Sequence, residues 1–299
     1  MLNFESLKIE NKEEYDRILR HRVRGCAHSF VNLYLWGRQK ALIHEGNLAV
    51  FSQFEGRSMY MFPAGEHVKP TIDALMADAA ERGIAFRLTG MVAEDCALLE
   101  QLYPGRFRIH TDRDHFDYVY EVTDLAQLQG RKYQKKRNHL NRFWQEHPDC
   151  VAVPMTVEML PRVTALVAQW YENRLNADPT ADFHMEKAAI KRALEHFSEL
   201  GMVGMVLEEK GELLAMTMGS AIFPEVFDVN FEKALDPAAY PAINNAFAKY
   251  IQEHHRSIRY LNREDDMGLE GLRKAKLSYC PEKLLEKSWA CLLEDGCDY

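Results

Sequence analysis

The alternation of hydrophobic and polar residues divides the first half of the chain into short strands separated by helices. The stretch "NLAVFSQFEGRSMYMFPAG" predicts two alternating strands around a turn at residues 55–57. Apolar spacing then predicts a helix over 68–82, the strand "AFRLTG", a helix near 94–102 and the aromatic strand "HFDYVYEV". The predicted order is therefore hairpin, helix, strand, helix, strand.

The second half repeats this order with one strand added. The strand "VAVPMT" precedes helices over 156–175 and 184–200, and "MVGMVLEEKGELLAMTMGSAI" predicts two strands joined at residues 210–211. The strand "EVFDVNFEK", the helix "PAINNAFAKYIQEHH", the strand "IRYLNR", the helix "GLEGLRKAKLSY" and a strand near 283–292 follow. Two similar successions in one chain indicate a duplicated α/β unit.

This order of elements predicts an α/β (α+β) fold with two tandem domains like the GNAT acyl-CoA N-acyltransferases, each with a mixed central sheet. We expect an N-terminal GNAT-like domain over 1–125 and a C-terminal one over 149–299. A basic amphipathic connecting helix over 126–148 would join them. A fold of this kind does not determine function, so the chemistry must be argued from particular residues.

The connecting segment "GRKYQKKRNHLNRFW" gathers positive charge in a chain whose formal net charge is −8. On a helix, Tyr133, Leu140 and Trp144 share one face, and most of the cations spread over the other. Acidic residues three or four positions away would offset the repulsion between these cations, and we expect none at those positions. This absence favours an anionic partner over a merely solvated linker helix. That partner could be the phosphates of RNA, anionic lipid headgroups or an acidic face of the other domain. The candidate phosphate-binding residues are Arg131, Lys132, Lys135, Lys136, Arg137 and Arg142.

Polar residues in two predicted strands of the second half form the candidate active site. In "EVFDVNFEK", alternation places Asp228, Asn230 and Glu232 on one face, where burial is costly unless they are paired or line a cavity. The next strand ends in "NREDD" and precedes a basic helix, so both polar segments could converge, either as a catalytic pocket or as a buried ion-pair network. The candidate catalytic residues are Asn230, Glu232, Arg263, Glu264 and Asp265. The candidate substrate-binding residues are Lys233, Asn244, Asn245, Lys274 and Lys276.

Composition narrows the class of protein. The pI near 5.9 argues against a broad RNA-coating surface. The N-terminal segment has no apolar core typical of a signal peptide, and the longest apolar run is about half of the ~20 residues that span a bilayer, so we expect a cytoplasmic protein. Six scattered cysteines with no C-x-x-C pair predict reduced thiols. The spacing of Asp178, Asp182 and His184 matches no established ligand pattern, so no metal site is expected.

Four motifs carry a resemblance to a known family: "FVNLYLWG", "GRKYQKKRNHLNRF", "VNFEKALDPAAYPAINNAFAKYI" and "YLNREDDMGLEGLRKAKLSY". Together they resemble uncharacterised bacterial proteins similar to the soluble C-terminal domain of phosphatidylglycerol lysyltransferases. The resemblance implies a tandem GNAT-like fold. It also implies transfer of an aminoacyl group from charged tRNA to a lipid hydroxyl or a peptide amine.

We therefore expect an aminoacyltransferase that passes an aminoacyl group from charged tRNA to a hydroxyl or amine of a small-molecule or lipid acceptor, with possible peripheral contact with anionic lipid and no tightly bound cofactor. Glu232 and Asn230 would orient the substrates, Arg263 and Lys274 would stabilise negative charge, and Glu264 or Asp265 would take the proton. One alternative is an acyl-CoA-dependent N-acyltransferase, although "EKALDPAAYPAINN" has no glycine where acetyl-CoA enzymes cradle pyrophosphate. Another alternative is a non-catalytic module that binds an amino acid, a lipid or a nucleic acid.

Overall fold

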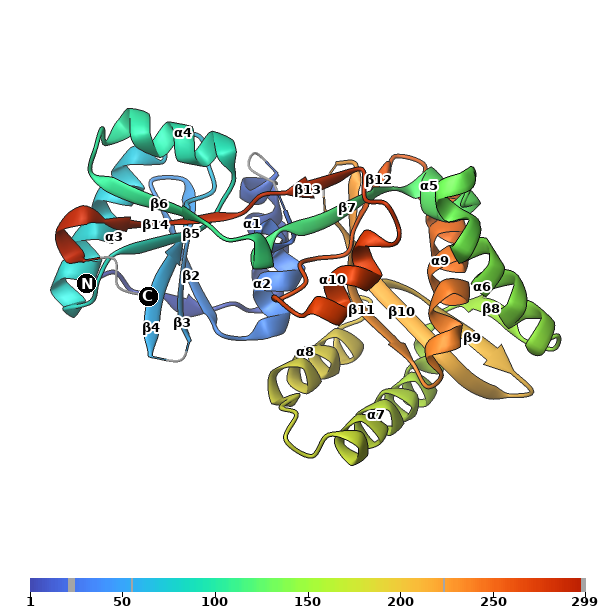
Figure 1. Cartoon of the computed structure of the whole chain (residues 1–299). Coiled ribbons are helices and arrows are strands. Elements are labelled where there is room, and N and C mark those ends of the chain that lie inside the picture. Colours follow the sequence, from blue (N-terminus) through green and yellow to red (C-terminus); the bar gives the residue numbers. More distant parts are fainter. Residues whose placement is uncertain (21–24, 55, 223, 297–299) are drawn as a thin grey trace. The chain divides into compact units, whose positions relative to one another are not determined.

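The computed structural model describes residues 1–20, 25–54, 56–222 and 224–296 (Figure 1). The chain divides into two compact units. The first comprises Met1–Asp117, Asp265–Leu269 and Leu284–Tyr299, and the second comprises Tyr118–Glu264 and Glu270–Lys283. Two mixed sheets of seven strands each confirm the predicted α/β class. Glu55, in the predicted hairpin turn, lies outside the described residues.

The first sheet has the strand order β1-β2-β3-β4-β5-β14-β6. Its neighbouring strands are antiparallel except β4 and β5, which are parallel. Its strands are β1 (Glu5–Ser6), β2 (Gln39–His44), β3 (Asn47–Phe54), β4 (Arg57–Met61), β5 (Arg87–Met91), β6 (Phe107–Thr111) and β14 (Ser288–Leu292). The helices of this unit are α1 (Lys12–Leu19), α2 (Phe30–Trp36), α3 (Lys69–Arg82) and α4 (Ala93–Leu102). The predicted hairpin, both predicted helices and the strand "AFRLTG" are confirmed, whereas β2 and β6 were not predicted.

Helix α3 shows how the sequence determines a local element of the first unit. Pro70 lies in its first turn, where a missing N–H costs nothing, and Gly83 ends it with a left-handed φ of 66°. Ile72 and Leu75 are fully buried in the core that also contains Tyr60. Burial of each such side chain stabilises the fold by about 1.5–3 kcal/mol.

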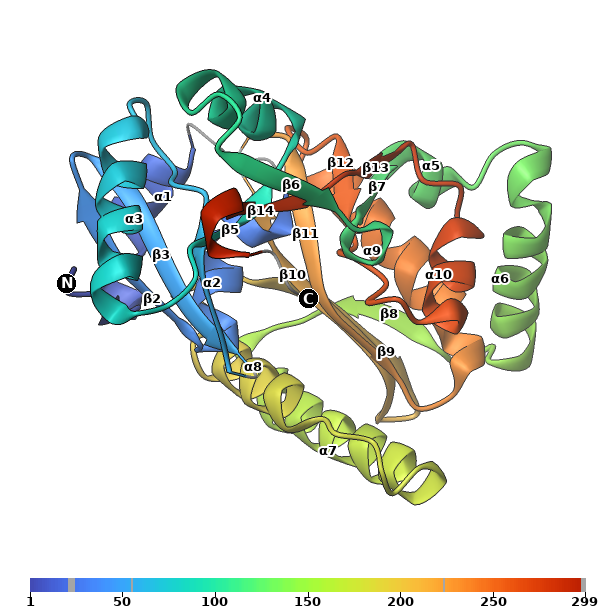
Figure 2. The same ribbon diagram turned by 60° about the vertical axis from the view of Figure 1, so that its left-hand side comes forward.

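The second sheet has the strand order β13-β7-β12-β11-β10-β9-β8, in which β11 and β12 are parallel. Its strands are β7 (Asp117–Glu121), β8 (Val151–Pro154), β9 (Val203–Glu209), β10 (Glu212–Ile222), β11 (Val226–Ala234), β12 (Tyr260–Asn262) and β13 (Lys283–Leu285). The helices of this unit are α5 (Val122–Gln127), α6 (Gln134–Glu146), α7 (Leu160–Ala177), α8 (His184–Glu195), α9 (Tyr240–His254) and α10 (Glu270–Leu277). Figure 2 shows α7 and α8 on one side of strands β9–β11 and α9 on the other. The predicted succession from "VAVPMT" to the helix "GLEGLRKAKLSY" is confirmed.

Two strands join a different sheet from the one that their position in the sequence indicates. Strand β7 closes the first predicted succession, yet it pairs with β12 in the second sheet. The predicted closing strand near 283–292 is two strands, and the second of them, β14, lies between β5 and β6 in the first sheet. The segment from Leu284 onward therefore completes the first unit, whereas the sequence placed it in the C-terminal domain. Alternation predicts that a segment is a strand but not which strand it pairs with.

Cys26, Cys96, Cys150 and Cys280 are not part of a disulfide, so their thiols are reduced, as predicted. Cys291 is disulfide-bonded, so the prediction of reduced thiols is wrong for this residue. Cys297 lies outside the described residues.

The longest helix of the second unit, α7, illustrates why its helices belong to a globular fold. Over its 18 residues, only Val163, Leu166, Val167 and Tyr171 are buried, and they lie on one stripe. Among the helices that the structure describes, none has the length and apolar character needed to cross a membrane.

Candidate functional site

The candidate site lies where the pairing between β11 and β12 ends. Within the described residues, the two strands pair only from Val226↔Tyr260 to Asp228↔Asn262. The rest of β11 continues to Ala234, beyond the end of β12. In open α/β sheets, ligands bind at the carboxyl ends of parallel strands, so the residues at this edge are the ones to test for chemistry.

A β-bulge interrupts the predicted alternation of β11. Met218 pairs with Phe231 and Ser220 pairs with Asp228, so two steps along β10 match three along β11. An extra residue of this kind bends a strand and re-aims its side chains, and bulges are enriched beside active sites. Strict alternation, on which the single polar face of the strand was predicted, does not hold across this bulge. Asn230 Nδ2 donates to Asp228 Oδ2 at 3.0 Å.

Glu232 and Arg263 form an ion pair between the end of β11 and the residue that follows β12. Arg263 Nη2 and Nε lie 2.6 and 3.2 Å from Glu232 Oε2. The side chains of Arg263 and Glu232 are 11% and 19% exposed. Burial by itself lowers the pKa of Arg263, but the charge and hydrogen bond of Glu232, together with Tyr120 and Tyr279, raise it above its usual value. The structure thus brings together two of the predicted catalytic residues.

The aromatic ring of Tyr279 joins this ion pair to the basic helix α6. Arg263 Cζ lies 5.2 Å from the centroid of the Tyr279 ring, and Lys136 Nζ lies 3.8 Å from the same centroid. Burial, and then the charge of Arg263, lower the pKa of Lys136 to about 8. Lys136, predicted from the sequence to bind phosphate, therefore lies in the same site as Glu232.

Tyr120 on β7 is a member of this site that the sequence did not identify. Its ring centroid lies 5.8 Å from Arg263 Cζ, and its hydroxyl donates to the backbone carbonyl of Lys276 at 2.9 Å. Burial raises the pKa of Tyr120. Its strand was recognised as aromatic, but it reaches the site only because β7 belongs to the second sheet.

Two polar atoms of this site are buried and have no hydrogen-bond partner in the described part of the chain: Arg263 Nη1 and Asn244 Oδ1. Asn244 lies on α9, and its side chain forms a hydrogen bond with the hydroxyl of Tyr279. A buried polar group without a partner costs about 1–3 kcal/mol. These two atoms therefore suit a ligand that accepts a hydrogen bond from Arg263 Nη1 and donates one to Asn244 Oδ1.

Lys233 lies in a separate cluster of the second unit. Its Nζ is 2.6 Å from Glu186 Oε1 and 3.9 Å from the centroid of the Trp170 ring, and its side chain is 6% exposed. Burial lowers the pKa of Lys233, and Glu186 opposes that effect. This predicted substrate-binding residue is thus engaged with side chains of α7 and α8.

Two further predicted substrate-binding residues contact backbone carbonyls. Lys276 Nζ donates to the carbonyl oxygen of Arg263 at 2.5 Å, which ties α10 to the segment that follows β12. Asn245 Nδ2 donates to the carbonyls of Leu125 and Ala126, both at 2.8 Å, which ties α9 to α5. Lys274 is exposed on α10. These contacts position helices around the site.

The segment "NREDD" is divided between the two units. The backbone N–H of Glu264 donates to Asn262 Oδ1 at 2.8 Å, with Glu264 at a left-handed φ of 55°. Asp265 belongs to the first unit, where its Oδ2 lies 3.4 Å from Lys287 Nζ and 3.8 Å from His115 Nδ1. The segment does not act as a single carboxylate cluster.

The basic helix α6 is amphipathic, as predicted, with Tyr133 before it and Phe143 within it buried. The expectation that its cations have no acidic neighbour at i±4 is wrong for Arg142, whose Nε lies 2.8 Å from Glu146. Lys132 Nζ is paired with Asp124 at 2.8 Å.

The remaining predicted phosphate-binding cations of this region differ in their surroundings. Arg137 lies in α6, and its guanidinium donates to the carbonyls of Leu128 and Gly130 in the segment before the helix. Arg131 and Lys135 are exposed, and no carboxylate in the described ranges lies within ion-pair distance of either.

The N-terminus of α9 is the place where a GNAT-like fold would hold a pyrophosphate. Here the Asp236 carboxylate accepts a hydrogen bond from the N–H of Ala238 at 2.8 Å. Pro237 and Pro241 have no N–H to offer. A carboxylate and two prolines therefore occupy the position that needs free N–H donors.

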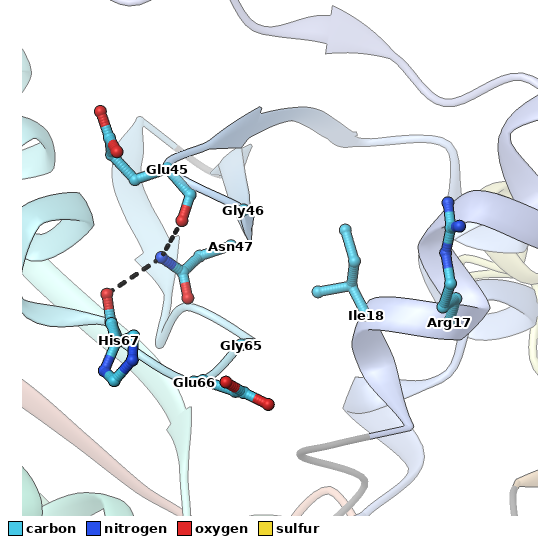
Figure 3. Close-up of a pocket in the computed structure, with 8 residues that line it drawn as sticks. All are labelled: Arg17, Ile18, Glu45, Gly46, Asn47, Gly65, Glu66 and His67. Carbon is cyan, nitrogen blue, oxygen red and sulfur yellow. Dashed lines mark hydrogen bonds between the residues drawn. The ribbon is translucent and has the colours of Figure 1, made fainter.

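A hollow of about 280 Å³ in the first unit contains none of the predicted site residues (Figure 3). Asn47, which lines the hollow, donates to the carbonyls of Glu45 and His67, both at 3.1 Å.

Asp178 and Asp182 accept backbone hydrogen bonds within their own loop. Across the described residues, no group of three or more His, Cys, Asp or Glu side chains is placed to hold a metal ion.

The model of the family "Phosphatidylglycerol lysyltransferase, C-terminal" matches residues 19–291. The chain belongs to this family. Among curated proteins, this lysyltransferase C-terminal family member is 23% identical over 175 residues to an uncharacterized protein of Mycoplasmoides gallisepticum. That match covers 57% of the chain and 54% of the relative, so the chain spans about half the length of the curated relative that it matches.

Solved structures that are similar to this chain confirm the tandem GNAT-like fold. A conserved protein of unknown function from Bacteroides thetaiotaomicron is 35% identical, with 98% of this chain and 100% of that one covered and a TM-score of 0.91. L-PGS from Bacillus licheniformis is 15% identical, with 98% and 94% covered and a TM-score of 0.69. A tandem GNAT protein from the clavulanic acid biosynthesis pathway is 10% identical, with both chains fully covered and a TM-score of 0.50. The last two show the fold alone.

Proposed function

We propose that this member of a transferase family is an aminoacyltransferase that moves an aminoacyl group from charged tRNA to a hydroxyl or amine acceptor. The observation that carries the proposal is the largely buried Glu232–Arg263 ion pair, which lies just beyond the point where β11 and β12 stop pairing. It supplies a carboxylate and a guanidinium whose Nη1 has no partner among the described residues. Membership in the lysyltransferase C-terminal family supports the choice of an aminoacyl group.

In the proposed reaction, a lone pair of the acceptor oxygen or nitrogen attacks the ester carbonyl carbon of the aminoacyl-tRNA. Arg263 already uses Nε and Nη2 for Glu232, so Nη1 is the group that donates to the developing oxyanion. Glu232 takes the proton of the acceptor and passes it to the departing ribose oxygen as the ester C–O bond breaks. Direct transfer of this kind needs no covalent intermediate on the protein.

The start of α9 favours aminoacyl-tRNA over acyl-CoA as donor. A CoA pyrophosphate would meet the carboxylate of Asp236 and lack the N–H groups that Pro237 and Pro241 cannot supply. The acyl-CoA alternative predicts saturable CoA binding, which isothermal titration would detect.

The proposal includes a cytoplasmic location, because charged tRNA is the donor, and leaves the acceptor as a lipid or a small molecule. The test is transfer of radiolabelled aminoacyl groups from a bulk charged tRNA pool into lipid and water-soluble acceptor fractions. Glu232→Gln is expected to lower turnover about 100-fold or more while the fold and tRNA affinity are retained. Glu195→Gln, in an exposed ion pair of α8, makes the same chemical change at a distant position and should retain full turnover. Absence of transfer from every charged tRNA to every fraction would overturn the proposal.

A further inference from the structure

The site around Tyr279 contains more positive charge than Glu232 neutralises. Lys136 and Arg263 approach the same aromatic ring, and Glu232 is bonded to Arg263. No carboxylate of the described residues lies within ion-pair distance of Lys136 Nζ. Two cations held this close, one of them with an unpartnered buried N–H group, repel each other unless an anion joins them.

We propose that Lys136 and Arg263 form an anion site that holds a phosphodiester group at the acceptor end of charged tRNA, beside Glu232. One of the two N–H groups of Arg263 Nη1 donates to a phosphate oxygen together with Lys136 Nζ, which leaves the other for the oxyanion, and the Tyr279 ring keeps both cations in place. The identity of this ligand rests on the proposed function, whereas the anion site itself is tested without tRNA.

The surface of α6 favours a nucleic acid over other sources of phosphate. Arg131 and Lys135 lie close to Lys136 in sequence, are exposed, and have no ion-pair partner in the described ranges. They extend the positive charge away from the site, as a polynucleotide with one phosphate per residue requires. A single phosphate would not need them.

Binding of the anion should be linked to uptake of a proton. The titratable or charged groups that face Lys136 are Arg263, Tyr279 and Cys280. An anion between Lys136 and Arg263 stabilises the charged form of Lys136 and raises its pKa above the value of about 8 that it has in the free protein. Affinity for the anion should therefore fall as the pH rises through 8.

The first experiment measures binding of inorganic phosphate by isothermal titration calorimetry at pH 8 in two buffers with different ionisation heats. The variants Lys136→Gln and Lys135→Gln remove the same charge from adjacent positions, one half-buried at the site and one exposed. Lys136→Gln should weaken phosphate binding about tenfold or more and abolish the buffer-dependent heat, whereas Lys135→Gln should retain both. Thermal unfolding verifies that each variant is folded, and Lys136→Met provides a second variant that preserves the packing on Tyr279. Equal effects at the two positions would overturn the site.

The second experiment identifies the source of the phosphate by competition. Charged tRNA should displace inorganic phosphate from the wild type, and its affinity should fall with salt and with each of Arg131→Gln and Lys135→Gln. Displacement by phosphatidylglycerol vesicles and not by tRNA would overturn the nucleic-acid assignment in favour of a lipid phosphate. Phosphate binding that depends on Lys136 in a protein without transferase activity would retain the anion site and reject the proposed function, so the two failures are distinguishable.

Discussion

Lys287 Nζ lies 2.6 Å from Asp117 Oδ1 in the first unit, where the Asp117 side chain is fully buried and that of Lys287 is 13% exposed. Burial by itself lowers the pKa of Lys287, but Cys26, Asp117 and Asp265 together raise it well above its usual value. Asp117 begins β7 and Lys287 immediately precedes β14. The ion pair therefore joins the two strands that belong to other sheets than their positions in the sequence indicate.

Replacing Lys287 with Met should destabilise the protein by about 3–5 kcal/mol, because it removes a cation bound to the buried carboxylate of Asp117. Chemical denaturation followed by circular dichroism measures the change. Lys191→Met is the control, since Lys191 and its partner Glu195 are 75% and 53% exposed, and it should change the free energy of unfolding by less than about 1 kcal/mol. A loss at Lys287 no larger than at Lys191 would show that the buried pair does not stabilise the first unit.

Asn244→Leu should change stability little while weakening substrate binding, because removal of the unpartnered Oδ1 offsets loss of the hydrogen bond between the Asn244 side chain and Tyr279. The change eliminates a buried Oδ1 that has no partner among the described residues, at a similar side-chain volume. The same change removes the hydrogen-bond acceptor, Oδ1, that the substrate is expected to use. The KM for charged tRNA or for the acceptor substrate should therefore rise about tenfold. Melting temperature and steady-state transfer are measured on the same preparation. A variant that is destabilised by several kcal/mol would instead assign Asn244 a structural role.

Lys136 should make the stability of the protein rise with pH above 8. Its pKa is lowered to about 8 in the folded protein, while in the unfolded chain it keeps the ordinary lysine value, so the unfolded state binds more protons between these two values. The free energy of unfolding attributable to Lys136 therefore increases from pH 8 upward and levels off near pH 10.5. Comparing denaturation of the wild type and Lys136→Met across this range isolates the effect from other lysines and tyrosines. Parallel pH profiles for the two proteins would mean that Lys136 titrates as an ordinary surface lysine.

Ala290→Asp should unfold the first sheet around β14. Ala290 is fully buried in the first core, between β5 and β6, and a carboxylate there has no room for water. We expect a loss of more than about 3 kcal/mol, with faster hydrogen exchange at the amides of β5 and β6. Arg108→Asp places the same side chain at an exposed position of β6 and should leave this exchange pattern intact. Slow exchange in both variants would indicate that β14 is dispensable to the sheet.

Most of the secondary structure could be predicted from the sequence because its signals are local. Pro70 and Gly83 bound α3, and the alternation in "NLAVFSQF" and "VFDVNFEK" identifies β3 and β11. Strands β2 and β6 were not predicted, because five or six residues give too short a pattern.

The candidate site was predicted in part. The polar segments that contain Glu232 and Arg263 were expected to converge, and they do, because β11 and β12 are parallel neighbours whose carboxyl ends lie at one edge. The bulge in β11 and the contact of Lys136 with Tyr279 have no local signal, because they depend on the register between strands and on the packing of α6.

The sequence by itself determined where most of the helices and strands form, that α6 is basic on one face, and that Glu232 and Arg263 lie near the ends of two successive strands. Only the tertiary structure decided that β7 pairs in the second sheet and β14 in the first, that Asp265 belongs to the first unit and Arg263 to the second, and that Lys136 and Arg263 contact the same Tyr279 ring. The physical reason is that propensity and periodicity are properties of a few consecutive residues. Strand partners, burial and pKa shifts depend instead on groups that are distant in sequence and become neighbours only when the chain is folded.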